Sequence, residues 1–219
     1  MTLPKSTCVL LCLALAACSN NDLKQAKAPA AVKAPPAAVT HAWLDEYEPK
    51  VKEAINGSQF EFERKDNVLL VTLPVDKSFN PDRPNMLLSN TLGPLSRLAK
   101  LVEHDDKVGV LILGHADTSG SLATNQKLSI ERAGSVTAIF RLSGLQNDRL
   151  TRKGVGVDMP RAANDSPEGR ALNRRVEIML TRKDTLAAML AKYSRPACTE
   201  VAQTQVKAEK DKTTLAKNP

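Results

Sequence analysis

The sequence predicts an α+β fold in which helices pack on one face of a mixed β-sheet, with a helix and a hairpin at the N-terminal side. Two observations carry this prediction. Apolar residues recur at helical spacing in some segments, and they alternate or run continuously in others. These segments follow the order helix, hairpin, helix, strand, helix, strand, strand, which is typical of helices covering one sheet. Neither end of the 219-residue sequence has the composition of a packed core. The sequence between them is long enough for roughly one domain.

Each element is predicted from the spacing of its apolar residues and from the turn residues beside it. The predicted elements are helix 43–55, hairpin strands 60–63 and 68–73, helix 92–102, strand 108–113, helix 121–142, strands 150–157 and 176–180, and a helical turn at 184–192. The first helix places four large apolar residues four positions apart. Asp66 and Asn67 provide the hairpin turn, and Pro81 and Pro84 mark the loop before the second helix.

The second half of the sheet is predicted from one continuous apolar run and one alternating run. Residues 108–113 have no polar side chain, which indicates a buried strand ended by Gly114. Gly154 and Gly156 interrupt the next strand. After a polar loop, apolar residues alternate within 176–180 in the last strand.

The first 17 residues predict an export signal. Lys5 supplies a positive charge, and about ten apolar residues follow, which are too few to span a bilayer. The segment ends in Leu-Ala-Ala before Cys18, which resembles the lipobox of bacterial lipoproteins. This resemblance implies that Cys18 is lipidated. Position 19 is Ser and not the Asp that often retains such lipoproteins in the inner membrane, which favours the outer membrane. An ordinary secretory signal, cleaved after a small residue, is the alternative.

The remaining boundaries are predicted from composition. Residues 18–40 form a tether rich in Ala, Pro and Lys, which would extend at about 3.1 Å per residue. Residues 41–65 hold the N-terminal helix and strand, and residues 66–183 hold the principal domain. Residues 184–219 are a short helix and a polar, Lys-rich, disordered tail.

Composition excludes several functional classes. The net charge is +7, but aromatic residues make up only 3%. Nucleic-acid binders without groove-reading motifs interleave basic and stacking aromatic residues, so the charge indicates an anionic polymer or membrane surface instead. The Gly-x-Ser-x-Gly and His-Glu-x-x-His motifs are absent, and the 4 cysteines lack metal-ligand spacing. We therefore expect no enzyme activity, no metal and no cofactor.

A candidate site follows the buried strand. Asp117 lies just beyond the strand's carboxyl end, where sheets often bind ligands, although acidic residues are also common in turns. On the next predicted helix, Asn125, Ser129 and Arg132 lie on or beside the buried face. A buried arginine needs a partner. Two interpretations stay open: an Asp117–Arg132 salt bridge, or a carboxylate and a guanidinium held apart for a zwitterionic ligand.

Four ordered motifs resemble the OmpA-like domain. The motifs are Gly114-His115-Ala116-Asp117, Asn125-x-x-Leu128-Ser129-x-x-Arg132-Ala133-x-x-Val136, Gly154-x-Gly156 and Gly169-Arg170-Ala171-x-Asn173-Arg174-Arg175-Val176-Glu177-Ile178. This domain occurs in OmpA-type porins, peptidoglycan-associated lipoproteins and flagellar stator proteins. The resemblance covers residues 108–180, with weaker agreement from residue 68 onward.

The resemblance implies reversible binding of peptidoglycan at the diaminopimelate of its stem peptide. It implies that Asp117 pairs with the ligand's ammonium and that Arg132 clamps a carboxylate. Asn125 would hydrogen-bond the stem, Leu128 would form an apolar wall, and Arg174 would add positive charge. The chain would then tether the outer membrane, through its lipid anchor on the periplasmic face, to the cell wall.

The resemblance leaves an alternative and two departures. The alternative is an adaptor of an envelope secretion or signalling complex, in which helix 43–55 and the basic tail dock a protein partner. Ala116 stands where the family often has Thr, and residues 74–79 match the family's first strand only loosely. Arg175 is the weaker candidate of the adjacent arginines, because neighbouring strand residues point to opposite faces.

Overall fold

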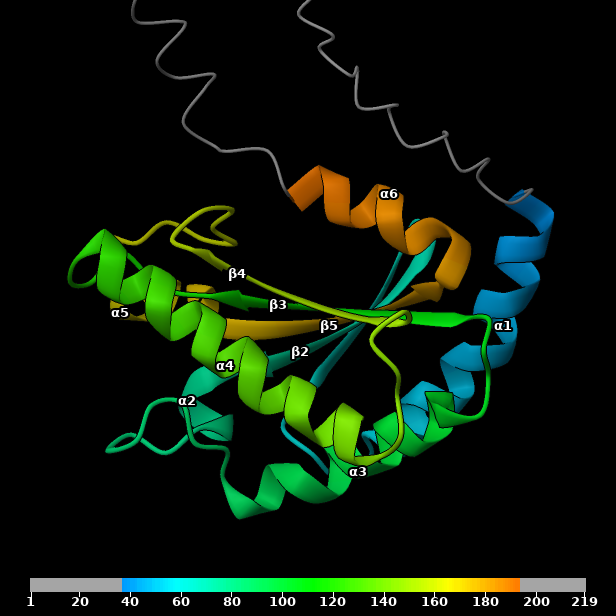
Figure 1. Ribbon diagram of the computed structural model, residues 1–219. Coiled ribbons are helices and arrows are strands. Elements are labelled where there is room, and N and C mark those ends of the chain that lie inside the picture. The colour runs from blue at the N-terminus through cyan, green and yellow to red at the C-terminus, as the bar shows by residue number, and fades with distance from the viewer. Residues whose placement is uncertain (1–36, 194–219) are drawn as a thin grey trace, which may run out of the picture. The chain divides into compact units, whose positions relative to one another are not determined.

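The computed structural model describes residues 37–193 (Figure 1). The elements are α1 (Ala37–Ala54), β1 (Glu61–Lys65), β2 (Val68–Pro74), α2 (Val75–Ser78), α3 (Ser89–Glu103), β3 (Val108–His115), α4 (Leu122–Leu142), β4 (Leu150–Gly156), α5 (Pro167–Asn173), β5 (Arg175–Arg182) and α6 (Lys183–Tyr193). The predicted signal, Cys18 and most of the predicted tether and tail lie outside the described residues. None of the helices within 37–193 is long and apolar enough to cross a membrane.

The five strands form one mixed sheet in the order β1-β2-β5-β3-β4. Three neighbouring pairs are antiparallel, whereas β3 and β4 run parallel and are connected by α4. The predicted turn joins β1 to β2, and Asp66 adopts a positive φ of 49° there, as two-residue hairpin turns require. The predicted α+β class and mixed sheet are confirmed.

The larger hydrophobic core lies between one face of the sheet and helices α1, α3 and α4. Successive residues of β3 point to opposite faces, so Val110 and Ile112 enter this core while Leu111 and Leu113 enter a smaller one. The smaller core includes Leu186 of α6, which lies across the opposite face of the sheet in Figure 1. The continuous apolar run in β3 thus reflects burial on both faces.

The structure corrects the interpretation of three segments. Residues 74–79 are not a strand: after Pro74 ends β2, the chain makes the helical turn α2. Part of the predicted polar loop is the start of α5, where the Ser166 side chain accepts a hydrogen bond from the Gly169 amide. The apolar side of α1, including Trp43 and Tyr47, packs into the chain's own core.

Close packing of α4 on the sheet brings the helix to the carboxyl end of β3. A Cβ atom at Gly114 would lie 2.0 Å from the carbonyl oxygen of Ser129, so only glycine fits there. Ser121 caps the helix by accepting a hydrogen bond of 3.1 Å from the amide of Thr124. The first turns of α4 therefore lie beside the loop that contains Asp117.

Candidate functional site

Asp117 lies just past β3 in a loop that fixes its carboxylate. Its side chain accepts a hydrogen bond of 2.8 Å from the Ser119 amide and one of 2.7 Å from Nη1 of Arg174. Burial would raise the pKa of this carboxyl, but the hydrogen bonds from Arg174 and Ser119 outweigh it and lower the pKa. Asp117 is therefore an anion at neutral pH.

Arg174 joins two carboxylates that are far apart in the sequence. It donates from Nε and Nη2 to the two carboxylate oxygens of Asp76, at 2.9 and 2.6 Å, and from Nη1 to Asp117. The fork geometry of the guanidinium permits such a bidentate contact. The side chain is about a quarter exposed, at 27%. Hydrogen bonds from this guanidinium to Asp76 raise the pKa of Arg174 above its ordinary value.

Arg132 on α4 is nearly buried, with 5% of its surface exposed. Its Nε donates a hydrogen bond of 2.8 Å to the carbonyl oxygen of Pro84, and the guanidinium carbon lies 5.9 Å from the centre of the Phe79 ring. Within residues 37–193, the two terminal nitrogens donate to no other group, yet they are not enclosed by protein. They can therefore donate two parallel hydrogen bonds to a ligand.

Burial and, to a smaller extent, the positive charge of Arg174 lower the pKa of Arg132 to about 10, while Asp76 and Asp117 oppose the shift. Arg132 thus stays charged at neutral pH. The four charged groups, two carboxylates and two guanidiniums, sum to zero. A site with separated charges of both signs and no net charge fits a zwitterionic ligand better than a simple anion.

Asn125 and Leu128 lie on the same side of α4 as Arg132. The amide nitrogen of Asn125 donates to the carbonyl oxygens of Asp117 and Ser119, at 3.0 and 2.9 Å. Both of its donor hydrogens are thereby used to hold the loop, and only its side-chain oxygen is left to accept a hydrogen bond from a ligand. Leu128 is half-buried, one turn before Arg132.

The structure brings together Asp117, Arg174 and Asn125 through direct contacts and places Arg132 nearby. The ion pair predicted as one interpretation, Asp117 with Arg132, is not formed among the described residues, because Arg174 takes that place. Asp76 was not predicted as a site residue, and it lies in the segment interpreted as a strand. Only the loose match of residues 74–79 to the family could have pointed to it.

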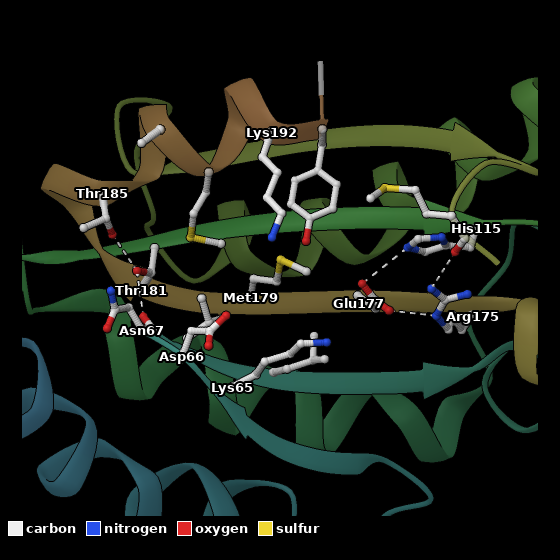
Figure 2. Close-up of a pocket in the computed structure, with 16 residues that line it drawn as sticks. Lys65, Asp66, Asn67, His115, Arg175, Glu177, Met179, Thr181, Thr185 and Lys192 are labelled. Atoms are coloured by element: carbon white, nitrogen blue, oxygen red, sulfur yellow. Dashed lines mark hydrogen bonds and ion pairs between the residues drawn. The ribbon is translucent and has the colours of Figure 1, made fainter. Parts of the chain in front are cut away.

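Arg175 points away from this site, as the alternation of strand side chains predicted. It contacts Glu177 at 2.7 Å on the opposite face of the sheet, and Oε2 of Glu177 lies 3.4 Å from Nε2 of His115 (Figure 2). Burial raises the pKa of Glu177, but His115 and Arg175 outweigh this and hold the pKa at about 2. These three residues form a separate buried polar cluster.

Comparison with known protein families finds a match to one family in the part of the chain that contains the candidate site. Residues 79–174 match the OmpA family. This segment contains every residue of the candidate site apart from Asp76. It ends at Arg174, so that α2 and all of β5 lie outside the match.

Three similar proteins illustrate the relationship. The outer-membrane lipoprotein YfiB of Pseudomonas aeruginosa is 40% identical over 101 residues, which cover 46% of this chain and 58% of YfiB. The peptidoglycan-binding protein ArfA of Mycobacterium tuberculosis is 38% identical over 86 residues, covering 39% of this chain and 26% of ArfA. The cell wall anchor of the T6SS from Pseudomonas aeruginosa has a structure similar to this one, with a TM-score of 0.50 and 27% identity, covering 68% of this chain and 98% of the anchor. The chain thus spans less than two thirds of the length of both curated relatives.

Proposed function

We propose that this chain, whose residues 79–174 form a domain of the OmpA family, binds peptidoglycan non-covalently at the site formed by Asp117 and Arg132. The observation that carries the proposal is that Arg132 is nearly buried but uses only one of its nitrogens in an internal hydrogen bond. A guanidinium that is only 5% exposed has one internal hydrogen bond and two terminal nitrogens that can still donate. Because these two nitrogens are not enclosed by protein, a bound carboxylate can accept a hydrogen bond from each of them.

The ligand group that fits these charges is a diaminopimelate residue of the stem peptide. Its free carboxylate would accept two hydrogen bonds from Arg132, and its ammonium would approach Asp117 and Asp76. Arg174 would share those carboxylates and keep them in place. Asn125 would accept one hydrogen bond through its side-chain oxygen, and Leu128 would contact the aliphatic part of the stem. No bond is made or broken in such binding.

The relatives support a place in the cell envelope. YfiB is named an outer-membrane lipoprotein and ArfA a peptidoglycan-binding protein. We extend this to lipidation of Cys18 and to a tether over residues 18–40 that lets the domain reach the cell wall from the outer membrane. Replacement of Cys18 by Ser should abolish metabolic labelling with radioactive palmitate and release the protein from the membrane fraction.

The binding test compares the chain from Ser19 to Pro219, which retains every described residue, with single-residue variants. Each protein is incubated with insoluble peptidoglycan and sedimented, and its melting is followed by circular dichroism. We expect the parent to sediment and Arg132→Ala and Asp117→Asn to remain in the supernatant. Arg141→Ala, which removes the same charge from an exposed position of α4, is the matched control and should sediment like the parent.

Soluble muropeptides then test the ligand group. We expect tighter binding of muropeptides with diaminopimelate than of those with lysine, because lysine lacks the second carboxylate, and we expect Arg132→Ala to remove the difference. If folded Arg132→Ala binds like the parent, Arg132 does not hold the ligand. If the parent stays in the supernatant, the chain does not bind peptidoglycan.

A second candidate function is an adaptor that anchors an envelope secretion complex to the cell wall. The likeness to the T6SS cell wall anchor over 98% of that chain favours it. The apolar side of α1 is used in the chain's own core, so an adaptor would have to offer another surface. Purification of the chain after cross-linking in cells should recover components of one envelope complex under this proposal, and only peptidoglycan-linked material under the first.

A further inference from the structure

A cavity of about 500 Å³ lies on the face of the sheet opposite α3 and α4 (Figure 2). Its walls come from α6, from strands β1, β2 and β5, and from the loop after β4. Volumes of this size are typical of sites for small molecules. The peptidoglycan proposal does not use this cavity, because Arg174 points to one face of the sheet and Arg175 to the other.

Most of the lining is apolar and deformable. The apolar residues that line it are Val68, Leu70, Met159, Met179, Ala188, Met189 and the ring of Tyr193. Thioether side chains adapt their shape to different apolar ligands. Met159 adopts a positive φ of 59°, which non-glycine residues rarely do, and its carbonyl oxygen accepts a hydrogen bond of 3.3 Å from Arg175. The loop thereby holds a large apolar side chain, 44% exposed, at the cavity.

Two lysines lie on opposite sides of the cavity. Figure 2 shows Lys192 extending from α6 and Lys65 from the end of β1, on either side of the lining. Neither forms an ion pair or hydrogen bond within residues 37–193. Two carboxylates line the cavity, and Glu177 is already paired with Arg175. Asp66 is therefore the one lining carboxylate left to balance the two ammonium groups. The unpaired charge at the cavity is therefore positive.

The polar cluster of His115, Arg175 and Glu177 lies at the other end of the cavity, and the ring of His115 forms no hydrogen bond with a described residue. His115 is 1% exposed, and neither ring nitrogen forms a hydrogen bond with a described residue, although Nε2 lies 3.4 Å from Glu177. Burial lowers the pKa of His115, so the ring is neutral at neutral pH and offers one donor and one acceptor. Buried polar atoms without a partner are uncommon in proteins and call for an explanation.

We propose that this cavity binds an amphiphilic anion, with an apolar chain against the methionines and an acidic head group between Lys65 and Lys192. A long apolar chain fits the thioether and aliphatic walls, and a carboxylate or phosphate fits the two ammonium groups. The site is independent of the peptidoglycan site, since the two use opposite faces of the sheet and share no residue.

Calorimetric titration of the chain from Ser19 to Pro219 with ten-carbon probes tests this proposal. We expect saturable binding of decanoate or decyl phosphate, and the comparison of these two tells a fatty-acid-like head group from a phospholipid-like one. Decyltrimethylammonium, with the opposite charge, should bind at least about tenfold more weakly. Asp117→Asn, which disables the proposed peptidoglycan site, should leave the affinity for decanoate unchanged.

Two pairs of variants locate the bound probe. Ala188→Trp fills the cavity and should abolish binding, whereas Ala187→Trp, on the adjacent exposed position outside the lining, should not. Lys65→Gln with Lys192→Gln should weaken decanoate binding roughly tenfold and leave decanol unaffected, and Lys100→Gln is the matched control for charge.

Several results would overturn the proposal. They are the absence of binding by the parent up to about 1 mM probe, equal affinity for the cationic probe, and indistinguishable titrations of the two tryptophan variants. Binding that arises only after residues 194–219 are deleted would also overturn it, in favour of the tail as the occupant.

Discussion

Arg174 donates a hydrogen bond of 2.7 Å to Asp117 and holds Asp76 with its other two nitrogens, at 2.9 and 2.6 Å. One guanidinium thus connects α2 with the loop after β3. Asp117 is 6% exposed and keeps one oxygen for the Ser119 amide. The position of the Asp117 carboxylate, which we propose faces the ligand, therefore depends on Arg174.

The first prediction concerns Asp76, which holds Arg174 and would also face the ligand's ammonium. We expect Asp76→Asn to weaken binding of a diaminopimelate muropeptide roughly tenfold, because Arg174 loses its bidentate partner and shifts toward Asp117. Asp82→Asn removes the same charge from an exposed loop position nearby and should bind like the parent. Titration calorimetry on both variants, with matched melting curves, decides the matter; equal affinities for the two would remove Asp76 from the site.

The second prediction concerns Arg149, a buried residue that binds the carbonyl groups at the C-terminal end of α3. Its guanidinium donates to the carbonyl oxygens of Val102, Glu103 and Asp105, at 3.0, 2.8 and 2.8 Å. Because Arg149→Met would leave these carbonyls without a partner, we expect the free energy of unfolding to fall by about 2–4 kcal/mol. Arg141→Met, at an exposed position, should change it by less than about 0.5 kcal/mol. Urea denaturation measures both, and a small effect at Arg149 would mean that water replaces the guanidinium.

The sequence predicted the order of the main elements because their apolar spacing is strong. It did not predict α2 or α5, which are 4 and 7 residues long and carry too few apolar residues to show a period. The prediction that the helices pack on one face of the sheet was wrong for α6, which packs on the opposite face. Because β3 is apolar on both faces, its residues do not indicate which face a helix covers.

For the candidate site, too, the sequence predicted local relations between residues but not contacts between distant ones. Spacing along α4 placed Asn125 and Arg132 on one face, and alternation in β5 separated Arg174 from Arg175, since both relations are local. The partners of these side chains are not local. Asp76 lies 98 residues from Arg174 in the sequence, and the carbonyl of Pro84 lies 48 residues from Arg132. Such pairs follow from the packing of loops, which has no period in the sequence.

The third prediction contrasts two glycines. A Cβ at Gly114 would lie 2.0 Å from the backbone carbonyl of Ser129, whereas a Cβ at Gly134 would meet only the terminal nitrogen of Arg152, at 2.5 Å. Backbone cannot move without shifting α4, but an arginine side chain can turn away. We expect Gly114→Ala to lower the free energy of unfolding by more than about 2 kcal/mol. Gly134→Ala should be neutral or stabilise the helix by up to ~1 kcal/mol, as thermal denaturation would show.

The fourth prediction concerns acid stability and the cluster of His115, Arg175 and Glu177. Glu177 is 8% exposed, and its pKa of about 2 in the folded chain lies below the value of about 4.3 expected when unfolded. A lowered pKa means that the unfolded chain binds the proton more tightly. The contribution of Glu177 to stability is therefore complete above about pH 4.3 and is lost as the pH falls toward 2.

This loss is on the order of 3 kcal/mol for the parent between pH 5 and pH 2. Glu177→Gln should be less stable than the parent at neutral pH, because Arg175 loses its charged partner, but its stability should depend less on pH in this range. Glu61→Gln changes an exposed carboxyl that pairs with Arg161 and should keep the parent's pH dependence. Urea denaturation at constant ionic strength and four pH values measures the slopes. Equal slopes for Glu177→Gln and the parent would mean that other carboxyl groups govern the acid transition.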